Sequence, residues 1–304
     1  MRKKSNKPLQ TSKVTKLIVK EETIIMDFLL QKMGGMSRTS IKSLLSHNQV
    51  TVNDKTVKRF DHQLKANDIV IISNKRKDPE LKNPLLNIIF EDDDLIVVEK
   101  KEGLLTVTTG SGIDTTAFSI LKEHVQQKSP ENKIFTVHRL DKWTSGILIF
   151  AKNADAQHTL RDHWHNIVTK RTYIALVEGV VKTKKGKISS WLTENEKTFV
   201  IYSSPVDNGG KLAITNYKLL ETFEDSSLLE IELETGRKNQ IRVHMKDIGH
   251  PIVGDKKYGA KTTIDRLALH AQVLEFYHPT TNKLIHFESP IPKEFYKTPK
   301  LVSE

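Results

Sequence analysis

The sequence predicts an α+β protein, in which a small module of helices and a hairpin precedes a larger domain built on a mixed, mainly antiparallel β-sheet with a few flanking helices. Three observations favour this class. The 304 residues are enough for one large or two modest domains with a real core. The apolar runs, such as LIVV at 95–98, have the length of strands. A polar segment near residue 80 separates two parts with different patterns.

Composition excludes several classes of protein. Hydrophobic residues make up 37% and charged residues 28% of the chain, the balance of an ordinary folded domain rather than of a disordered coil. The apolar runs are too short to cross a bilayer, and no apolar segment of a secretory signal follows the basic start, so we expect a cytoplasmic protein. The chain has no cysteine, which excludes disulfides, thiolate catalysis and cysteine-ligated metal sites.

The excess of basic residues points to nucleic acid as the partner. Lys and Arg number 48 against 37 Asp and Glu, a formal net charge of +11. Surplus surface lysine would produce the same balance, so the position of the charges must decide. Residues 1–22 are basic and polar, and we expect them to be a flexible arm that either touches phosphate or stays solvated.

Residues 23–73 are expected to form a compact module. Apolar side chains recur at helical spacing in IIMDFLLQKM, and a Gly-Gly pair ends that helix. Ser37 fits the N-cap of a second helix over 37–48, on which Arg38 and Lys42 share one cationic face.

A basic hairpin follows these helices. VTVNDKTVKRF has its expected turn near Asn53 and Asp54, and DIVIIS closes the module as a strand. This order of elements resembles the S4 RNA-binding domain. The resemblance implies that the module binds RNA and that Arg38 and Lys42 contact it; a generic unit with solvated lysines is the alternative. The matching positions are Ser37, Arg38, Ile41, Val50, Val52 and Asn53.

A second domain is expected after a linker. Residues 74–83 are polar and contain a proline, which is typical of a linker, so the second domain should span 84–304. Its apolar runs predict a sheet with few helices. Strands are expected within 87–103, 146–153, 172–181, 214–223, 227–236 and 283–290, and helices at 118–127 and 155–166.

The densest group of functional side chains lies in VHRLDKWTSGILIFAKN, residues 137–153, directly before an apolar strand. Asp141 stands near Arg139 and Lys142, whose charges favour its carboxylate form. It is therefore available as a nucleophile or base rather than as an acid. An Arg-Leu-Asp triplet taken alone is usually a surface ion pair.

HRLD.TSG followed by an apolar strand and AK resembles the signature of the RluA-type pseudouridine synthases, which isomerise uridine to pseudouridine in ribosomal or transfer RNA. The match continues in the family's order through KRTYIALVEG, GGKLAITNYKLLE, ETGRKNQIRVHMKDIGHPIVGDKKYG and RLALHA, and covers nearly all of residues 84–290. An S4 module ahead of this domain is a common arrangement in the family. The resemblance implies an isomerase that acts on RNA.

The resemblance also implies a role for individual residues. Asp141 stands at the essential aspartate, which attacks either the ribose C1′ or the base C6, and the sequence does not choose between them. Tyr173 matches the tyrosine that packs against the target base. Arg242 matches the arginine that pairs with the aspartate, for which two-point geometry is expected. A contact to the extruded nucleotide is implied for Arg139 and apolar walls of the pocket for Leu140 and Ile241. Arg237 follows Gly236 in a basic loop that either contacts phosphate or stays solvated.

The reaction implies no cofactor, because it involves neither redox change nor an external group. No metal is expected either, since His163 and His165 at i and i+2 on a helix would point apart. Large-subunit ribosomal RNA is the favoured substrate and transfer RNA the alternative. Competing functions are a non-catalytic RNA-binding or ribosome-assembly protein and a nucleoside hydrolase. A monomer is the default expectation.

Overall fold

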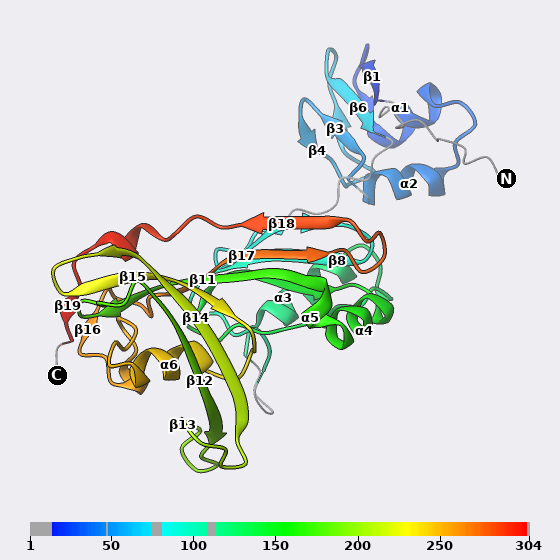
Figure 1. Ribbon diagram of the computed structural model, residues 1–304. Coiled ribbons are helices and arrows are strands. Elements are labelled where there is room, and N and C mark those ends of the chain that lie inside the picture. Colours follow the sequence, from blue (N-terminus) through cyan, green and yellow to red (C-terminus); the bar gives the residue numbers. More distant parts are fainter. Residues whose placement is uncertain (1–13, 47, 74–80, 109–113, 303–304) are drawn as a thin grey trace. The chain divides into compact units, whose positions relative to one another are not determined.

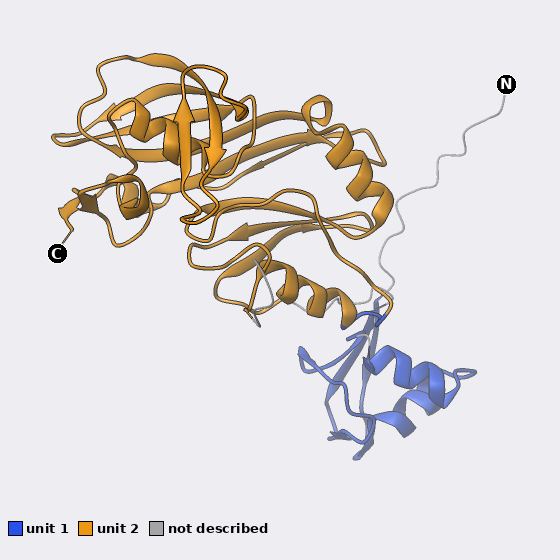
Figure 2. Cartoon of the chain, turned by 90° about the horizontal axis from the view of Figure 1, so that it is seen from below, with its two compact units in different colours: residues 1–80, 127–130 blue, residues 81–126, 131–304 orange. Residues whose placement is uncertain are grey.

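The computed structural model describes residues 14–46, 48–73, 81–108 and 114–302. The chain divides into two compact units, one of residues 1–80 with 127–130 and one of residues 81–126 with 131–304 (Figure 2). Each unit has a hydrophobic core of its own.

The smaller unit combines two helices with a four-stranded antiparallel sheet of order β1-β6-β3-β4 (Figure 1). Leu29 and Ile41 of the helices share one buried core with Val50 and Val70 of the strands. The elements are β1 (Val14–Ile18), β2 (Thr23–Ile24), α1 (Ile25–Lys32), α2 (Arg38–Ser46), β3 (Val50–Val52), β4 (Lys55–Thr56), β5 (Gln63–Leu64) and β6 (Ile69–Ser73).

Local signals in the sequence explain these elements. Ser37 caps α2, because its Oγ accepts the backbone N–H of Ser40 at 3.1 Å. Asn53 and Asp54 form the two-residue turn between β3 and β4, with φ angles of 47° and 65°, a left-handed conformation that Asn and Asp tolerate. Both predicted helices, the hairpin and the closing strand are present.

The prediction of a flexible arm over residues 1–22 is wrong for part of that range. Residues 14–18 form β1, which pairs with β6 from Val14↔Ser73 to Ile18↔Ile69. Local sequence did not indicate this strand, because a short edge strand between lysines is stable only beside a partner far along the chain. Residues 1–13 of the expected arm, and 74–80 of the expected linker, lie outside the described residues.

The larger unit is built on an 11-stranded sheet with the path β13-β12-β14-β15-β11-β17-β10-β8-β7, with β18 beside β17 and β9 beside β10. Among its described strands only β10 and β17 pair in parallel, so the predicted mainly antiparallel α+β class is confirmed. The strands are β7 (Leu86–Glu91), β8 (Leu95–Lys100), β9 (Phe135–Thr136), β10 (Ser145–Ala151), β11 (Val168–Glu178), β12 (Lys185–Glu194), β13 (Ile201–Ser204), β14 (Lys211–Thr222), β15 (Ser226–Leu233), β17 (Leu269–Tyr277) and β18 (Leu284–Glu288). Outside this sheet, β16 (Thr262–Thr263) pairs with β19 (Lys300–Leu301).

Helices cover both faces of the sheet where β8 runs. Ile96 and Val98 share a core with α3 (Ala117–Gln126), whereas Leu95 and Val97 share a second core with α4 (Ala154–Asp162). Successive strand residues point to opposite faces, so the LIVV run is buried throughout because both faces are covered.

Several elements of the larger unit differ from expectation. The helix predicted over 155–166 is interrupted, because α4 ends at Asp162 and α5 (Trp164–Ile167) is separate. The sequence did not predict β12, β13, β17 or α6 (Gln240–Asp247), although β17 lies inside the sheet and α6 carries Arg242. Two 3₁₀ turns, η1 (Lys256–Tyr258) and η2 (Lys293–Tyr296), complete the unit. Across the described ranges, no helix has the length and apolar character needed to cross a membrane.

Candidate active site

A cavity of about 170 Å³ lies in the larger unit. It is bounded by the turn that follows His138, by β11, by the loop that precedes α6 and by α6 itself. Arg38 and Lys42 lie elsewhere, on α2 of the smaller unit. The cavity brings together the other residues singled out in the sequence, namely Arg139, Leu140, Asp141, Tyr173, Arg237, Ile241 and Arg242.

The turn that carries Asp141 is held by hydrogen bonds on both sides. Thr144 donates its backbone N–H to the carbonyl of Asp141 at 3.1 Å and closes the turn. Before the turn, the hydroxyl of Thr106 donates to the carbonyl of Leu140 at 2.7 Å. At its corner, the amino group of buried Lys100 donates to the carbonyl of Lys142 at 3.2 Å. The carboxylate of Asp141, 27% exposed, is therefore presented from a preorganised backbone.

Gly146 explains how this turn reaches the centre of the sheet. Its φ is 114°, and a Cβ built there would lie 2.1 Å from the carbonyl oxygen of Ala271 on β17. A side chain of any size is excluded at this contact. The glycine thus lets β10 and β17 approach in parallel, directly after the turn that holds Asp141.

Arg242 is the cation nearest to Asp141, but its main partner is a different carboxylate. Its Nε and Nη2 both donate to Asp255, each at 2.7 Å, and the side chain of Asp255 is fully buried. Its Nη1 lies 3.6 Å from Oδ2 of Asp141. The prediction of a two-point contact between Arg242 and Asp141 is therefore wrong. Arg242 makes its two-point contact with Asp255, because it projects from α6 toward the turn before η1. Only Nη1 of the guanidinium lies near Asp141.

The surroundings of Arg242 keep it charged and oriented. Burial favours the neutral form, but the hydrogen bonds and charge of Asp255 and the charge of Asp141 outweigh it and raise the pKa of Arg242. The guanidinium lies 5.0 Å from the ring centroid of Tyr258, and Asn239 accepts from Nη1 at 3.3 Å. Asn239 also donates to the Tyr258 hydroxyl at 3.0 Å, which fixes the orientation of the amide.

Tyr173 lies on β11 at the wall of the cavity and is 6% exposed. The register of β11 against β17 shifts between Thr172 and Tyr173, and such an irregularity re-aims a strand side chain. Burial raises the pKa of the Tyr173 phenol; Arg171 lowers it and the charge of Asp141 raises it again. The phenol is therefore protonated at neutral pH.

Sequence reasoning missed several residues of the site. Arg171 lines the cavity and donates to the carbonyl of Thr235 at 3.0 Å. Lys100 is fully buried, and burial lowers the pKa of its amine to about 7, with Asp141 and Glu102 raising it and Arg266 lowering it. Both residues could have been found from the sequence, because Arg171 lies two positions before Tyr173 in KRTYIAL and Lys100 lies in EKKEGLL, directly after an apolar run. The pairing of Asp255 with Arg242 depends on the fold alone.

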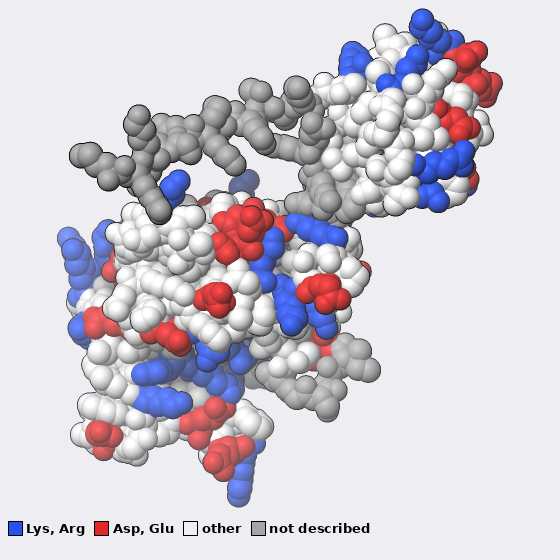
Figure 3. Space-filling view, turned by 90° about the vertical axis from the view of Figure 1, so that its right-hand side faces the viewer, with Lys and Arg blue, Asp and Glu red and all other residues white. Residues whose placement is uncertain are grey.

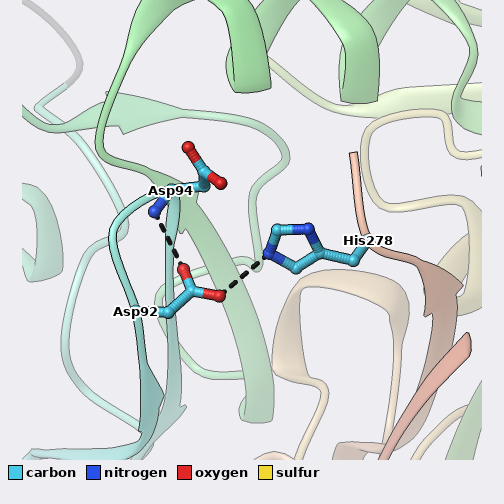
Figure 4. Close-up of side chains that lie close together, drawn as sticks. All are labelled: Asp92, Asp94 and His278. Carbon is cyan, nitrogen blue, oxygen red and sulfur yellow. Dashed lines mark hydrogen bonds and ion pairs between the residues drawn. The ribbon is translucent and has the colours of Figure 1, made fainter. Parts of the chain in front are cut away.

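A group of potential metal ligands outside the cavity is better explained as a hydrogen-bonded contact between two loops. Asp92, Asp94 and His278 lie together (Figure 4). Nδ1 of His278 accepts backbone N–H groups from Thr280 and Thr281, so Nε2 carries the proton and donates to Asp92 at 2.9 Å. The second oxygen of Asp92 accepts from Asp94 N–H at 2.9 Å. With these atoms engaged in hydrogen bonds, the group ties the loop after β17 to the turn between β7 and β8.

The sequence was compared with known families and proteins. The profile described as RNA pseudouridylate synthase matches residues 94–247, a span that contains Asp141, Tyr173 and Arg242. The chain belongs to this family. It is an enzyme that forms pseudouridine in RNA, and its relatives place it with the RluA-type synthases.

Two relatives and one solved structure show how far the similarity extends. The Bacillus subtilis protein named uncharacterized RNA pseudouridine synthase YlyB is 37% identical over 277 residues, which cover 88% of this chain and 90% of that protein. The ribosomal large subunit pseudouridine synthase D of Neisseria meningitidis serogroup B is 33% identical over 288 residues, 89% of this chain and 76% of that protein. The structure of human RNA pseudouridylate synthase domain containing 1 shares the fold, with a TM-score of 0.56, 24% identity, and coverage of 74% of this chain and 92% of that one.

Proposed function

We propose that this enzyme isomerises specific uridines of large-subunit ribosomal RNA to pseudouridine, with Asp141 as the nucleophile. The observation that carries the proposal is the position of Asp141 in a cavity beside Tyr173, with a charged and firmly held guanidinium 3.6 Å from its carboxylate. Ribosomal RNA is favoured over transfer RNA because a relative 33% identical to this chain is named for the large ribosomal subunit.

The chemistry needs only groups that the chain and the substrate supply. The carboxylate of Asp141 attacks C1′ of the ribose or C6 of the base, and the bond between N1 and C1′ breaks. The base turns, C5 bonds to C1′, and the bond between Asp141 and the nucleotide breaks, which regenerates the carboxylate. The proton on C5 leaves while N1 gains one. Atoms and electrons balance within the nucleotide, so neither an oxidant nor a group donor is required. Arg242 places a positive charge beside the carboxylate that attacks.

Tyr173 and the size of the cavity define how the uridine is held. The ring of Tyr173 offers an apolar wall to the base, and its protonated hydroxyl is a donor for a uracil carbonyl or for N1, the atom that gains a proton. Leu140 and Ile241 extend the apolar wall. A base reaches such a cavity only when its nucleotide is extruded from the RNA, at a cost of about a few kcal/mol, and Arg139 would stabilise the extruded state.

The remaining cations serve RNA binding in this proposal. Arg237 lines the cavity near its opening loop, whereas Arg38 and Lys42 belong to the smaller unit, which would act as an S4-type RNA anchor. Figure 3 shows Lys and Arg side chains in separate clusters on one face of each unit, with Asp and Glu between them. Residues 23–73 would then bind RNA and 84–304 would catalyse, in a cytoplasmic monomer.

Pseudouridine mapping across total cellular RNA tests this function and names the substrate. Three strains are compared: wild type, Asp141→Asn, and a strain without the gene. The amide preserves the shape of Asp141 and removes its charge. Asp93→Asn is the matched control, because Asp93 is an exposed aspartate between β7 and β8.

Each outcome of the mapping decides between the readings. Loss of the same large-subunit sites in the null and Asp141→Asn strains, with Asp93→Asn unchanged, supports the proposal. Loss of sites in transfer RNA instead would mean that transfer RNA, and not ribosomal RNA, is the substrate. If no site depends on Asp141 while the protein still binds RNA, a binding or assembly role takes the place of catalysis in this chain.

A further inference from the structure

The turn that carries Asp141 also presents an exposed tryptophan. Asp141 and Thr144 line the cavity from the two ends of the turn, whereas Lys142 and Trp143 form its corner, outside the cavity lining. Trp143 is 51% exposed. An indole left in water forgoes the stabilisation that burial of a large apolar ring provides, and this one stands two residues after Asp141, where RNA that enters the cavity would pass.

The ring of Trp143 has a defined support. A methyl group placed on Gly103 would lie 3.6 Å from Cζ3 of the indole, which is ordinary van der Waals contact. Gly103 donates its N–H to the carbonyl of Lys142 at 2.9 Å, and the same carbonyl accepts from the amino group of Lys100. The indole therefore lies beside the loop after β8, and this loop is tied to the turn of Asp141.

Lys142 adds a charge beside the ring. Its Nζ lies 5.3 Å from the centroid of the Trp143 ring, within the range of a cation–π contact. An aromatic face beside a cation is the combination on which unpaired bases of RNA stack, because every base has a π face and every nucleotide carries a phosphate. The buried centre of a protein–protein interface is depleted of charged residues, so the lysine beside the ring favours RNA over a protein partner.

We propose that Trp143 and Lys142 form a stacking platform for a base that neighbours the target uridine, with Lys142 beside its phosphate. The inference rests on the proposed function, because extrusion of the uridine leaves each neighbouring base with an unstacked face. Two residues of extended chain span at most roughly 7 Å. A base adjacent to the uridine held at Asp141 is therefore within reach of Trp143, and the indole replaces the stacking partner that the base has lost.

The competing explanation is purely structural, with Trp143 packed on Gly103 to stabilise the loop. The two explanations differ in their dependence on the RNA. Stacking requires a particular base next to the target, whereas a structural effect is the same for every RNA that binds.

A comparison of substituted proteins and substituted RNAs separates these explanations. The proteins are the full chain, Trp143→Ala, Trp143→Phe and, as the matched control, Tyr296→Ala, because Tyr296 is also 51% exposed but lies on η2. The probe is an unmodified transcript of large-subunit ribosomal RNA, followed by a fragment around the uridine that it converts. Two further fragments lack the base on the 5′ or the 3′ side of that uridine.

We expect Trp143→Ala to raise KM for the intact fragment by about fivefold or more, the factor typical of one lost base–aromatic stack. Trp143→Phe should retain most of the affinity and Tyr296→Ala all of it. The single-turnover rate at saturating enzyme should change much less than KM. With one of the two abasic fragments, the wild type and Trp143→Ala should become equal.

Two results would overturn the platform. One is equal affinity of wild type and Trp143→Ala for the intact fragment; the other is the same loss on the intact and on both abasic fragments, which is the structural effect. In either case conversion that depends on Asp141 leaves the proposed function standing. A wild-type protein that converts no uridine of the transcript overturns the proposed substrate and the platform together.

Discussion

Replacement of Asp255 by asparagine tests the finding that Arg242 is anchored by a buried carboxylate. Asp255 accepts two hydrogen bonds from Arg242, each 2.7 Å long, and its side chain is fully buried. Removing one partner of a buried ion pair costs about 3–5 kcal/mol, since the remaining charge stays desolvated. The amide of asparagine keeps one oxygen as an acceptor, so we expect a loss near the lower limit, about 3 kcal/mol in the free energy of unfolding.

This loss should appear as a lower melting temperature. For a domain of roughly 150 to 250 residues, 1 kcal/mol shifts Tm by about 2–4 °C, so Tm should fall by roughly 6 to 12 °C. The rate of pseudouridine formation in a single turnover should fall by about tenfold or more. Arg242 then has Asp141 as its nearest carboxylate among the described residues, and a closer contact between them would withdraw the Asp141 carboxylate from the cavity.

Thermal unfolding and single-turnover conversion at saturating enzyme, measured below the Tm of the variant, provide the two readouts. Asp93→Asn is again the exposed control and should change neither. A Tm within about 2 °C of wild type together with an unchanged rate would refute the reasoning. It would mean that Asp255 neither holds the guanidinium of Arg242 nor keeps it at its distance from Asp141. The limit of 2 °C is roughly the shift that 1 kcal/mol produces.

Three further predictions concern other groups of the site. Tyr173→Phe should lower the single-turnover rate by about 10²-fold, the usual contribution of a positioned proton donor, and leave KM for RNA nearly unchanged; an equal rise in KM would instead indicate a binding role. Lys100 has a pKa of about 7 in the folded protein, so between pH 7 and about 10 the unfolded chain binds more protons at this residue than the folded chain does. The free energy of unfolding of wild type, relative to that of Lys100→Met, should therefore rise by up to about 1.4 kcal/mol per pH unit. A difference that stays constant in urea unfolding at pH 7, 8 and 9 would contradict this. Gly146→Ala should prevent stable folding of the larger unit, because the new Cβ would meet the Ala271 backbone at 2.1 Å; a native circular dichroism spectrum and Tm would disprove the close approach.

Local patterns predicted those elements that local physics determines. The cap at Ser37 and the turn at Asn53 and Asp54 follow from side chains that bond or tolerate the backbone of their own neighbours. The LIVV run of β8 is readable because four consecutive apolar residues suit a strand covered on both faces. Resemblance to a known signature then identified several of the residues that line the cavity, some of which would otherwise look like ordinary surface ion pairs or core side chains.

Other elements could not be predicted because distant contacts decide them. In α6, the β-branched Ile241 and Val243 disfavour a helix, and the helix forms because Ile241 and Met245 are buried in the main core. β1 needs β6, which lies far along the chain. Asp255 looks like one acid among lysines in GDKKYG, and only the fold turns it toward Arg242. In each case the decisive partner is remote in sequence.

The division of Arg242 between two carboxylates has a chemical reason. A guanidinium that gripped Asp141 by two hydrogen bonds would occupy both of its oxygens, and a carboxylate so occupied is a poor nucleophile. Here the two-point contact is made with Asp255, which is buried and does not line the cavity. Asp141 receives the positive field at 3.6 Å without a short bond, so its oxygens remain accessible from the cavity. The buried pair therefore holds a cation at a fixed distance from Asp141, the proposed nucleophile, and this distance is what a substitution at Asp255 would change first.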